Sequence, residues 1–153
     1  MNISWQYLDK RQAAVAALKD FSSMKAIIAN TPREIAEVQY QMTGIRGMQY
    51  SDMPSGTHNP TAGEDRILKG IEKTDILKER YQQAVEFMEW YLPAWETLSD
   101  EEQDVLQLFY NSGNESQTEA VLTICERFCI ERTSAYKRKD RALTHLAILL
   151  YGK

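Results

Sequence analysis

The sequence is poor in the residues that cross-link or interrupt a fold. It has two cysteines, four prolines and seven glycines among its 153 residues, and no apolar stretch approaches the roughly 20 residues that span a bilayer. A structural zinc site normally needs four Cys or His ligands, and the spacing of His58 and His145 completes no such site with Cys125 and Cys129. We therefore expect no metal site, no membrane span and two buried thiols.

The sequence also lacks the motifs of common enzyme classes and of secretion. It contains no glycine-rich phosphate loop, no paired metal-ligand motif and no nucleophile elbow. His58 falls in a glycine-rich segment and His145 on the polar side of a predicted helix, so both are interpreted as surface histidines. The N-terminus, MNISWQYLDK, does not have the basic and then apolar layout of a secretory signal. We expect a cytosolic protein that is not an enzyme and needs no cofactor.

Helical periodicity, in contrast, is present through nearly every segment. Apolar residues recur at the spacing of one helix face, and no stretch shows the sustained two-residue alternation of a half-buried strand. The predicted fold class is therefore all-α. A first helix is expected over residues 4–29. Thr31 before Pro32 predicts the cap and first turn of a second helix that ends near Met42.

Residues 44–63 are predicted to form a loop, because they hold four of the seven glycines and two of the four prolines. From Glu64 a 4-3-4 apolar pattern resumes, interrupted only by Lys78, and Pro93 is expected to end this helix. The helix should fold back antiparallel, so residues 1–96 are predicted to be a coiled-coil-like helical hairpin for oligomerisation or partner binding. Its seam could close within one chain or between two copies in a homodimer. The predicted seam residues are Ile67, Ile71, Thr74, Tyr81, Val85, Met88 and Leu92.

Residues 97–153 are predicted to form a separate domain of three helices. Ser99 has the side chain of a helix cap, and Glu102 stands three positions on as its reciprocal partner. Ser116 or Thr118 can cap the second helix of this domain. The domain therefore begins with a well-marked short helix and continues into a second one.

The end of this domain has the layout of a DNA-binding helix-turn-helix. A short turn at residues 129–131 precedes a final helix over residues 132–150, and five of the chain's 18 cationic residues fall within ten positions of that helix. At about 100° per residue, one broad face of it is basic and hydroxyl-bearing and the opposite face is apolar. The residues predicted to contact double-stranded DNA are Arg132, Thr133, Ser134, Tyr136, Lys137, Arg138 and Arg141.

The distribution of charge favours DNA contact over a merely solvated basic surface. The cations lie in the first half of the helix, where the helix dipole disfavours them. Residues 97–131 have one basic and eight acidic residues, net −7, whereas residues 132–153 have six basic and one acidic, net +5. Because acidic supporting helices reduce the gain from counterion release, we expect modest DNA affinity for a monomer. A second copy, or a partner already on the DNA, would have to add to it.

The last third of the chain contains three spaced patterns, Leu98-x3-Glu102-x2-Val105-Leu106-x-Leu108-x-Tyr110, Ile124-x-Glu126-x-Phe128-x-Ile130 and Arg141-Ala142-Leu143-x2-Leu146. These patterns resemble the region-four helix-turn-helix of bacterial sigma factors. The loop stretch Ser-Asp-Met-Pro-Ser-Gly at residues 51–56 and the order of the parts resemble ArpU-like transcriptional regulators of phages and prophages in Gram-positive bacteria. The resemblance implies control of late-gene or mobile-element transcription.

Five residues depart from the sigma-type pattern. Cys125 and Cys129 stand where glycine is usual, and Glu131 stands at the usual Ser or Thr cap. Arg138 occupies a position that is often apolar. Lys139 falls within the apolar sector of the final helix, so its side chain should extend to solvent or meet a partner. These departures leave the start and the rotation of the final helix open.

Two other functions are compatible with the same residues. One is an RNA polymerase-binding adaptor, which would use the acidic helices and the long hairpin and have little DNA affinity of its own. The other is a phage DNA-packaging component, which can also join a helix-turn-helix to a helical oligomerisation element. DNA binding that is saturable and sequence-dependent without polymerase separates a regulator from the adaptor.

Overall fold

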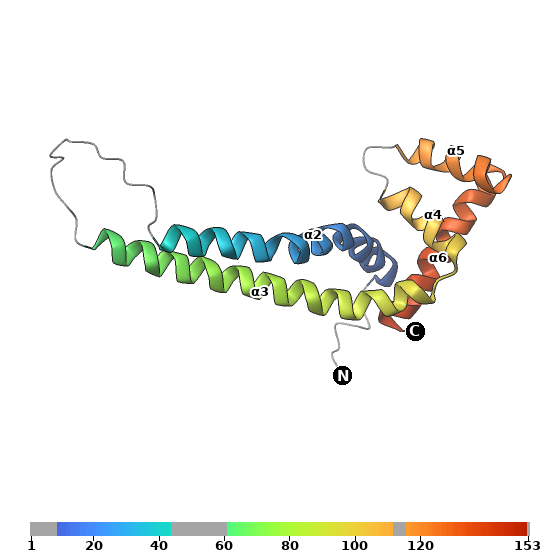
Figure 1. Cartoon of the computed structure of the whole chain (residues 1–153). Coiled ribbons are helices and arrows are strands. Elements are labelled where there is room, and N and C mark those ends of the chain that lie inside the picture. Colours follow the sequence, from blue (N-terminus) through green and yellow to red (C-terminus); the bar gives the residue numbers. More distant parts are fainter. Residues whose placement is uncertain (1–8, 44–60, 112–115, 153) are drawn as a thin grey trace. The chain divides into compact units, whose positions relative to one another are not determined.

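A computed structural model of the chain describes residues 9–43, 61–111 and 116–152. Over these ranges the regular structure is entirely helical, which confirms the predicted all-α class. No helix among them is long and apolar enough to cross a membrane. The predicted helical start at residues 4–8 and most of the predicted 44–63 loop lie outside the described residues. The helices are α2 (Lys10–Met42), α3 (Ala62–Thr97), α4 (Asp100–Tyr110), α5 (Gln117–Phe128) and α6 (Arg132–Tyr151) (Figure 1).

Pro32 lies inside α2 and does not start a new helix, so the predicted break near residue 31 is wrong. Thr31, expected as a cap, is buried within the helix, and its hydroxyl donates to the Ile27 carbonyl at 2.6 Å. A proline inside a helix costs about 3 kcal/mol, because one backbone hydrogen bond is lost. The helix continues because Pro32 itself is exposed, while Thr31 and Val38 are buried on the packed side.

Pro93 also fails to end a helix, since α3 continues to Thr97 instead of stopping near Leu92. Pro93 is exposed, whereas Tyr91 and Ala94 beside it are buried in an apolar core. Burying a large aromatic side chain stabilises a fold by about 2–3 kcal/mol. Tertiary packing of the residues around Pro93 therefore offsets the cost of the proline.

The helices pack into two compact units. The central unit consists of residues 25–85, and the terminal unit combines the residues up to 24 with those from 86 onward. The two ends of α2 and of α3 consequently belong to different units. The predicted division between residues 96 and 97 would instead separate residues 1–96 from residues 97–153, and it stays a prediction.

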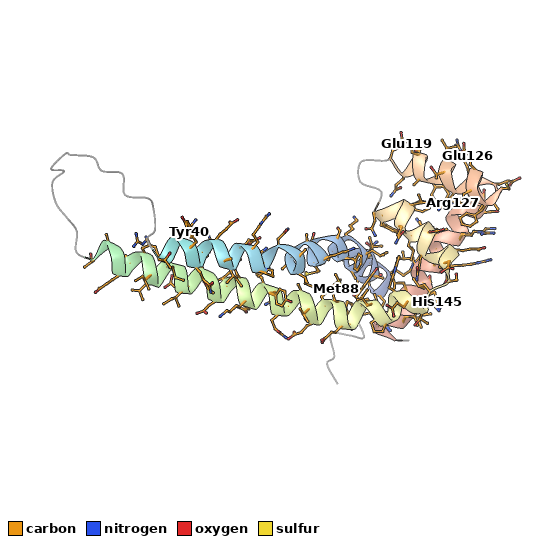
Figure 2. The ribbon with its side chains drawn as sticks, viewed as in Figure 1. Tyr40, Met88, Glu119, Glu126, Arg127 and His145 are labelled. Atoms are coloured by element: carbon orange, nitrogen blue, oxygen red, sulfur yellow. The ribbon has the colours of Figure 1, made fainter. Side chains whose placement is uncertain are left out.

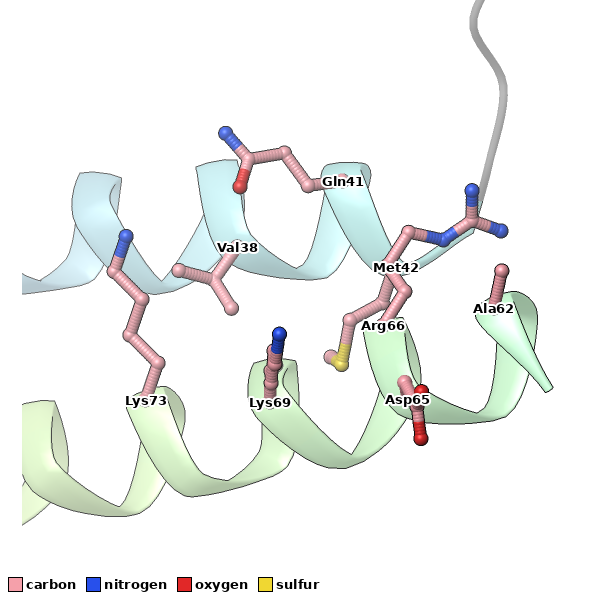
Figure 3. Close-up of a pocket in the computed structure, with 9 residues that line it drawn as sticks. Val38, Gln41, Met42, Ala62, Asp65, Arg66, Lys69 and Lys73 are labelled. Carbon is pink, nitrogen blue, oxygen red and sulfur yellow. The ribbon is translucent and has the colours of Figure 1, made fainter. Parts of the chain in front are cut away.

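In the central unit, the 25–42 part of α2 and the 62–85 part of α3 run in opposite directions side by side (Figure 1). Gly70 of α3 permits a close approach, because a Cβ atom at this position would meet the side chain of Met42. Figure 3 shows Met42 reaching from α2 toward α3. Because α3 begins at Ala62, the last two residues of the predicted loop are helical.

The row of α3 residues buried in the central unit shares only Thr74 with the predicted seam. The buried positions are Gly70, Thr74, Leu77 and Ala84. Ile67 and Ile71, which were predicted in the seam, are 45% and 48% exposed. The Thr74 hydroxyl donates to the Gly70 carbonyl at 2.8 Å, so this polar group is satisfied despite its burial. Small residues at the contact let two helices approach closely. The sequence-based prediction looked for large apolar residues and therefore selected the neighbouring row.

Two apolar cores hold the terminal unit together. The first core joins α2, α3, α4 and α6 through Ala14, Ala17, Leu18, Tyr91, Ala94, Leu98, Leu106, Ala142, Leu143, Leu146, Ala147 and Leu150. The second core joins α4, α5 and α6 through Val105, Val121, Ile124 and Ala135. The adjacent α4 residues Val105 and Leu106 thus belong to different cores, and α6 contributes to both.

The predicted capping pair of α4 is confirmed, and so is one of the two predicted caps of α5. Ser99 Oγ accepts from the Glu102 N–H at 3.3 Å, and the Glu102 carboxylate accepts from the Ser99 N–H at 3.0 Å. Ser116, rather than Thr118, caps α5 with Glu119 in the same reciprocal arrangement. Each such pair satisfies backbone donors that the first helical turn leaves unpaired, a contribution of about 1 kcal/mol.

Cys129 ends α5 in the left-handed backbone region, at φ 51° and ψ 48°. The Ile130 N–H donates to the Cys125 carbonyl at 3.1 Å, a bond typical of helix ends closed by a left-handed residue. Glycine adopts this region freely, whereas a residue with a Cβ atom is disfavoured there. Cys129 is exposed and Cys125 is half-buried, so the prediction of two buried thiols is wrong.

Replacing Cys129 with glycine should stabilise the protein. Cys129→Gly removes the left-handed cost, partly offset by the greater freedom of glycine in the unfolded chain, so the free energy of unfolding should rise by up to about 1 kcal/mol. Urea unfolding followed by circular dichroism measures the change. Cys129→Ala is the matched control, because it removes the thiol and keeps the backbone cost. An equal gain in both variants would contradict the backbone explanation.

Candidate nucleic-acid interface

The turn between α5 and α6 consists of residues 129–131. Ile130 packs against the second core, which anchors the turn to the terminal unit. Glu131 occupies the N-cap of α6 in an extended conformation but makes no side-chain capping hydrogen bond. The first turn of α6 therefore begins without the capping side chain that starts α4 and α5.

Burial divides α6 lengthwise into two sides. The side that faces the two cores buries Ala135, Ala142, Leu143, Leu146, Ala147 and Leu150. The other side exposes a row of residues spaced by three or four positions, which we call the open face: Thr133, Lys137, Arg141, Thr144 and Ile148. Three residues predicted to contact DNA thus lie in one row, and the exposed Arg132 lies in the first turn of the same helix.

Arg132, Lys137 and Arg141 are the unpaired members of the basic cluster. Each is exposed, and none makes an ion pair with any residue in the described part of the chain. A guanidinium or ammonium group in this state keeps all its donors for an external acceptor, such as a phosphate oxygen or a base edge. These three cations are the ones on α6 that carry no ion pair in the described part of the chain.

Arg138, in contrast, is held within the protein. Its Nη1 atom lies 3.2 Å from Glu101 Oε2, and its guanidinium lies over the Phe128 ring at 5.0 Å from the centroid. Ser134, one turn earlier, is half-buried. Arg138 therefore joins α6 to both α4 and α5, a role that the sequence-based prediction of a DNA contact did not include.

Tyr136 and Lys139 lie together against α4. The Tyr136 ring is 6.1 Å from the Phe109 ring, and the Lys139 ammonium lies 5.2 Å from the Phe109 centroid and 5.6 Å from that of Tyr136. The Lys139 side chain is only 20% exposed. Of the two expectations for Lys139, that its side chain extends to solvent or that it meets a partner, the second is confirmed. Its ammonium lies near two aromatic rings and 3.7 Å from Asp140 Oδ1.

Asp140 is the one acidic residue of α6. Its Oδ1 atom lies 3.0 Å from Arg11 Nη2 and 3.7 Å from Lys139 Nζ. Two cations therefore neutralise the carboxylate that would otherwise repel a polyanion approaching Arg141. Sequence reasoning missed Arg11, which lies on α2, because no local pattern signals a contact between residues so distant in the chain.

His145 was predicted to be a surface histidine, and the structure places it half-buried and in contact with another residue. Its side chain is 43% exposed, and Nδ1 lies 3.0 Å from Glu102 Oε1 (His145 is labelled in Figure 2). Burial opposes ionisation of Glu102, but hydrogen bonds from Ser99 and His145 outweigh it and hold the pKa of Glu102 below its ordinary value. The carboxylate thus caps α4 and also holds α6. The strongly acidic first turn of α4 was the signal in the sequence that could have indicated a cationic partner.

The helices beside α6 are acidic. On α5, Glu119 and Glu126 are exposed, and Arg127 is paired with Asp104 of α4 at 3.3 Å (Figure 2). The unpaired positive charge therefore lies on the N-terminal half of α6, and the helices beside it add mainly negative charge. This arrangement limits the favourable contact to a narrow basic strip.

Comparison with known proteins assigns no family to this chain. Protein-family models, curated proteins and solved structures gave no significant match. Among the residues described by the structure, no three Cys, His, Asp or Glu side chains gather closely enough to hold a metal ion.

The lowered pKa of Glu102 predicts a loss of stability in acid. Because the folded state binds the proton less tightly than the unfolded state, the contribution of this carboxylate is complete above about pH 5 and is lost as the pH falls through the ordinary and then the folded pKa. We expect the free energy of unfolding to fall more steeply in acid for the native protein than for Glu102→Gln, by up to about 1 kcal/mol, because the carboxylate is half-buried and its His145 partner is partly exposed.

Urea unfolding between about pH 3 and pH 7 measures the free energy of unfolding of both proteins as a function of pH. This interval brackets the ordinary carboxylate pKa of about 4.3. Glutamine retains a capping side chain, so the helix start survives in the variant. Glu89→Gln, which changes an exposed glutamate of α3, is the matched control. Parallel curves for the native protein and Glu102→Gln would contradict the prediction.

Proposed function

We propose that the chain is a sequence-specific regulator of transcription that binds double-stranded DNA and acts on phage or mobile-element genes. In this proposal it is an ArpU-like regulator that activates late genes. Residues 117–151 act as a helix-turn-helix similar to region four of sigma factors, with α6 in the major groove. α2 and α3 act as a helical hairpin that brings in a second copy or a partner protein.

The exposed row formed by Thr133, Lys137 and Arg141 is the observation that carries this proposal. Arg132 adds a third unpaired cation in the first turn of α6, on another side of the helix. From residue 133 to residue 141 the row extends over about 12 Å of helix, comparable with the width of the major groove of B-DNA, also about 12 Å. Lysine and arginine can contact guanine or phosphate, and threonine can contact phosphate or the thymine methyl group.

Ser134, Tyr136 and Arg138 are secondary candidates for DNA contact. Ser134 is half-buried, Tyr136 packs on Phe109, and Arg138 is paired with Glu101. Side chains that are already engaged give less new binding energy to a ligand, because their existing contacts must be released first. Their proposed role is to hold α6 at the rotation that presents the open face.

A second candidate function is an RNA polymerase-binding adaptor, which is favoured by the acidity of α4 and α5. The exposed Glu119 and Glu126 would oppose close approach of the DNA backbone, and they suit a basic protein surface. In this alternative, host polymerase supplies most of the affinity for DNA. A phage DNA-packaging component would instead bind at a genome packaging site.

Selection of bound sites from random double-stranded DNA, with and without host RNA polymerase, separates these functions. We expect enrichment of a defined sequence by the protein alone, because the open face presents side chains that can read base edges. Enrichment only in the presence of polymerase would favour the adaptor. A motif that maps to a genome packaging site would favour the packaging component, and no enrichment under either condition would contradict the regulator.

Alanine substitutions on α6 should divide into two classes. Lys137→Ala and Arg141→Ala should each weaken binding of the selected DNA by about 1–3 kcal/mol if the side chain reads a base, or reduce the salt slope by about 1 if it contacts phosphate. Arg138→Ala should mainly reduce stability, by about 1 kcal/mol, because it loses a surface ion pair and a cation–π contact. Fluorescence anisotropy at several salt concentrations measures the affinities.

Lys19→Ala is the matched control for the loss of one positive charge, since Lys19 is an exposed residue of α2 in the terminal unit. Its binding curve should be close to that of the native protein. If Lys137→Ala and Arg141→Ala behave like Lys19→Ala, the open face is not the DNA-binding surface. If Arg138→Ala has the largest effect on affinity at unchanged stability, the binding surface is rotated toward α4.

A further inference from the structure

The part of α3 in the central unit carries a second apolar row that α2 leaves exposed. Ile67, Leu68 and Ile71 are 45%, 59% and 48% exposed, Tyr81 is 36% exposed and Val85 is half-buried. Single exposed apolar residues are normal on a protein surface. Here they lie along one side of a helix, and Leu68, Ile71 and Val85 stand at positions that fit the alternating three- and four-residue spacing of a coiled-coil seam, which indicates a docking surface.

Two residues of opposite charge interrupt this row near its middle. Asp75 and Lys78 are both exposed, and neither forms an ion pair with another residue in the described ranges. At about 100° per residue, both point to the same side of α3 as Ile71. A partner for this surface must therefore offer apolar residues at both ends and charges of both signs in the centre.

We propose that the partner is a second copy of this chain, bound through an antiparallel contact between the two α3 helices. When two identical helices pair antiparallel, the residue numbers that face each other have a constant sum. If Asp75 faces Lys78 of the second copy, Lys78 faces Asp75 of that copy by symmetry. The same register brings Leu68 opposite Val85 and places Ile71 beside Tyr81. The row is thus complementary to itself, as a two-fold interface requires.

The charges select this direction of pairing. In a parallel, in-register pair, Asp75 would face Asp75 and Lys78 would face Lys78, so that like charges would repel in the centre of the contact. In the antiparallel pair both cross-chain contacts are attractive. A single acidic or basic residue would only disfavour the parallel pair, whereas one of each sign also adds two attractive contacts to the antiparallel pair.

The proposed contact is short. From Ile67 to Val85 the row extends over about 27 Å of helix, and the same register brings Glu64 toward Glu89 of the second copy just beyond its ends. Acidic residues that face each other there limit the contact to the apolar row. An interface of this length lies at the lower end of the range for specific association, so the dimer should dissociate on dilution.

This inference does not depend on DNA binding, because every residue that carries it lies on α3. If both proposals hold, the dimer would present two copies of α6 to DNA, which would add to the modest affinity of one copy. Its test measures association in the absence of DNA. A failure of dimerisation therefore does not count against the proposed function, and a failure of DNA binding does not count against the dimer.

Sedimentation equilibrium of the full chain from about 1 to 100 µM tests the association, since weak specific complexes dissociate in this range. We expect a monomer–dimer equilibrium that Ile71→Glu weakens at least about tenfold, because it buries an unpaired charge in the contact. Ile76→Glu is the matched control, because Ile76 is 58% exposed on another side of α3. Circular dichroism verifies that both variants are folded.

Charge exchange tests the register independently. Asp75→Lys and Lys78→Asp should each weaken self-association, and a mixture of the two variants should form a heterodimer, because opposite charges then face each other at both central positions. Direction is tested by cross-linking in a chain whose two native cysteines are replaced by serine. A chain with Leu68→Cys should form a disulfide with a chain carrying Val85→Cys, and not with itself.

Three results would overturn the proposal. The first is that the protein stays a monomer over the whole concentration range. If Ile71→Glu then lowers the thermal stability of that monomer, another segment of the same chain covers the row, and the proposal is equally wrong. The second is equal weakening by Ile71→Glu and Ile76→Glu. The third is self-linking of the Leu68→Cys chain, which would show a parallel pair.

Discussion

The arrangement of the terminal unit depends on the burial of one side of α6 in two cores at once. Ala135 near its start packs in the second core, and the residues from Ala142 to Leu150 pack in the first. The adjacent α4 residues Val105 and Leu106 supply one side chain to each core. Because α6 is held at both ends, its rotation is set, and the open face must point away from both cores.

Electrostatic contacts then divide the cations of α6 by function. Arg138 and Lys139 are drawn to Glu101, Asp140 and aromatic faces, where they help hold the helix in place. The three cations without such partners are on the exposed surface. The acidity of α4 therefore has two effects: it holds one border of α6, and it restricts where a polyanion can approach. A basic segment in an acidic protein is consistent with both effects.

Local chemistry was predicted more successfully than packing. The Ser99 and Glu102 pair was identified correctly because a capping box depends only on residues three positions apart. The helix start predicted at Pro32 and the helix end predicted at Pro93 were wrong, since the local cost of proline is outweighed by burial of neighbours such as Thr31 and Tyr91. The seam of α3 was displaced for a related reason. A prediction from size and hydropathy assigns large apolar residues to the seam, whereas the close contact between the two helices is made at small residues such as Gly70.

The sequence by itself determined the helical class, the capped starts of α4 and α5, and the basic character of the final helix. These follow from periodicity, from short-range hydrogen bonding and from composition. Only the tertiary structure decided which of the cations are free and which apolar row of α3 stays exposed. Both depend on residues far apart in the chain, as the contact between Arg11 and Asp140 illustrates. Such contacts arise from the combined burial of several helices, which no local pattern encodes.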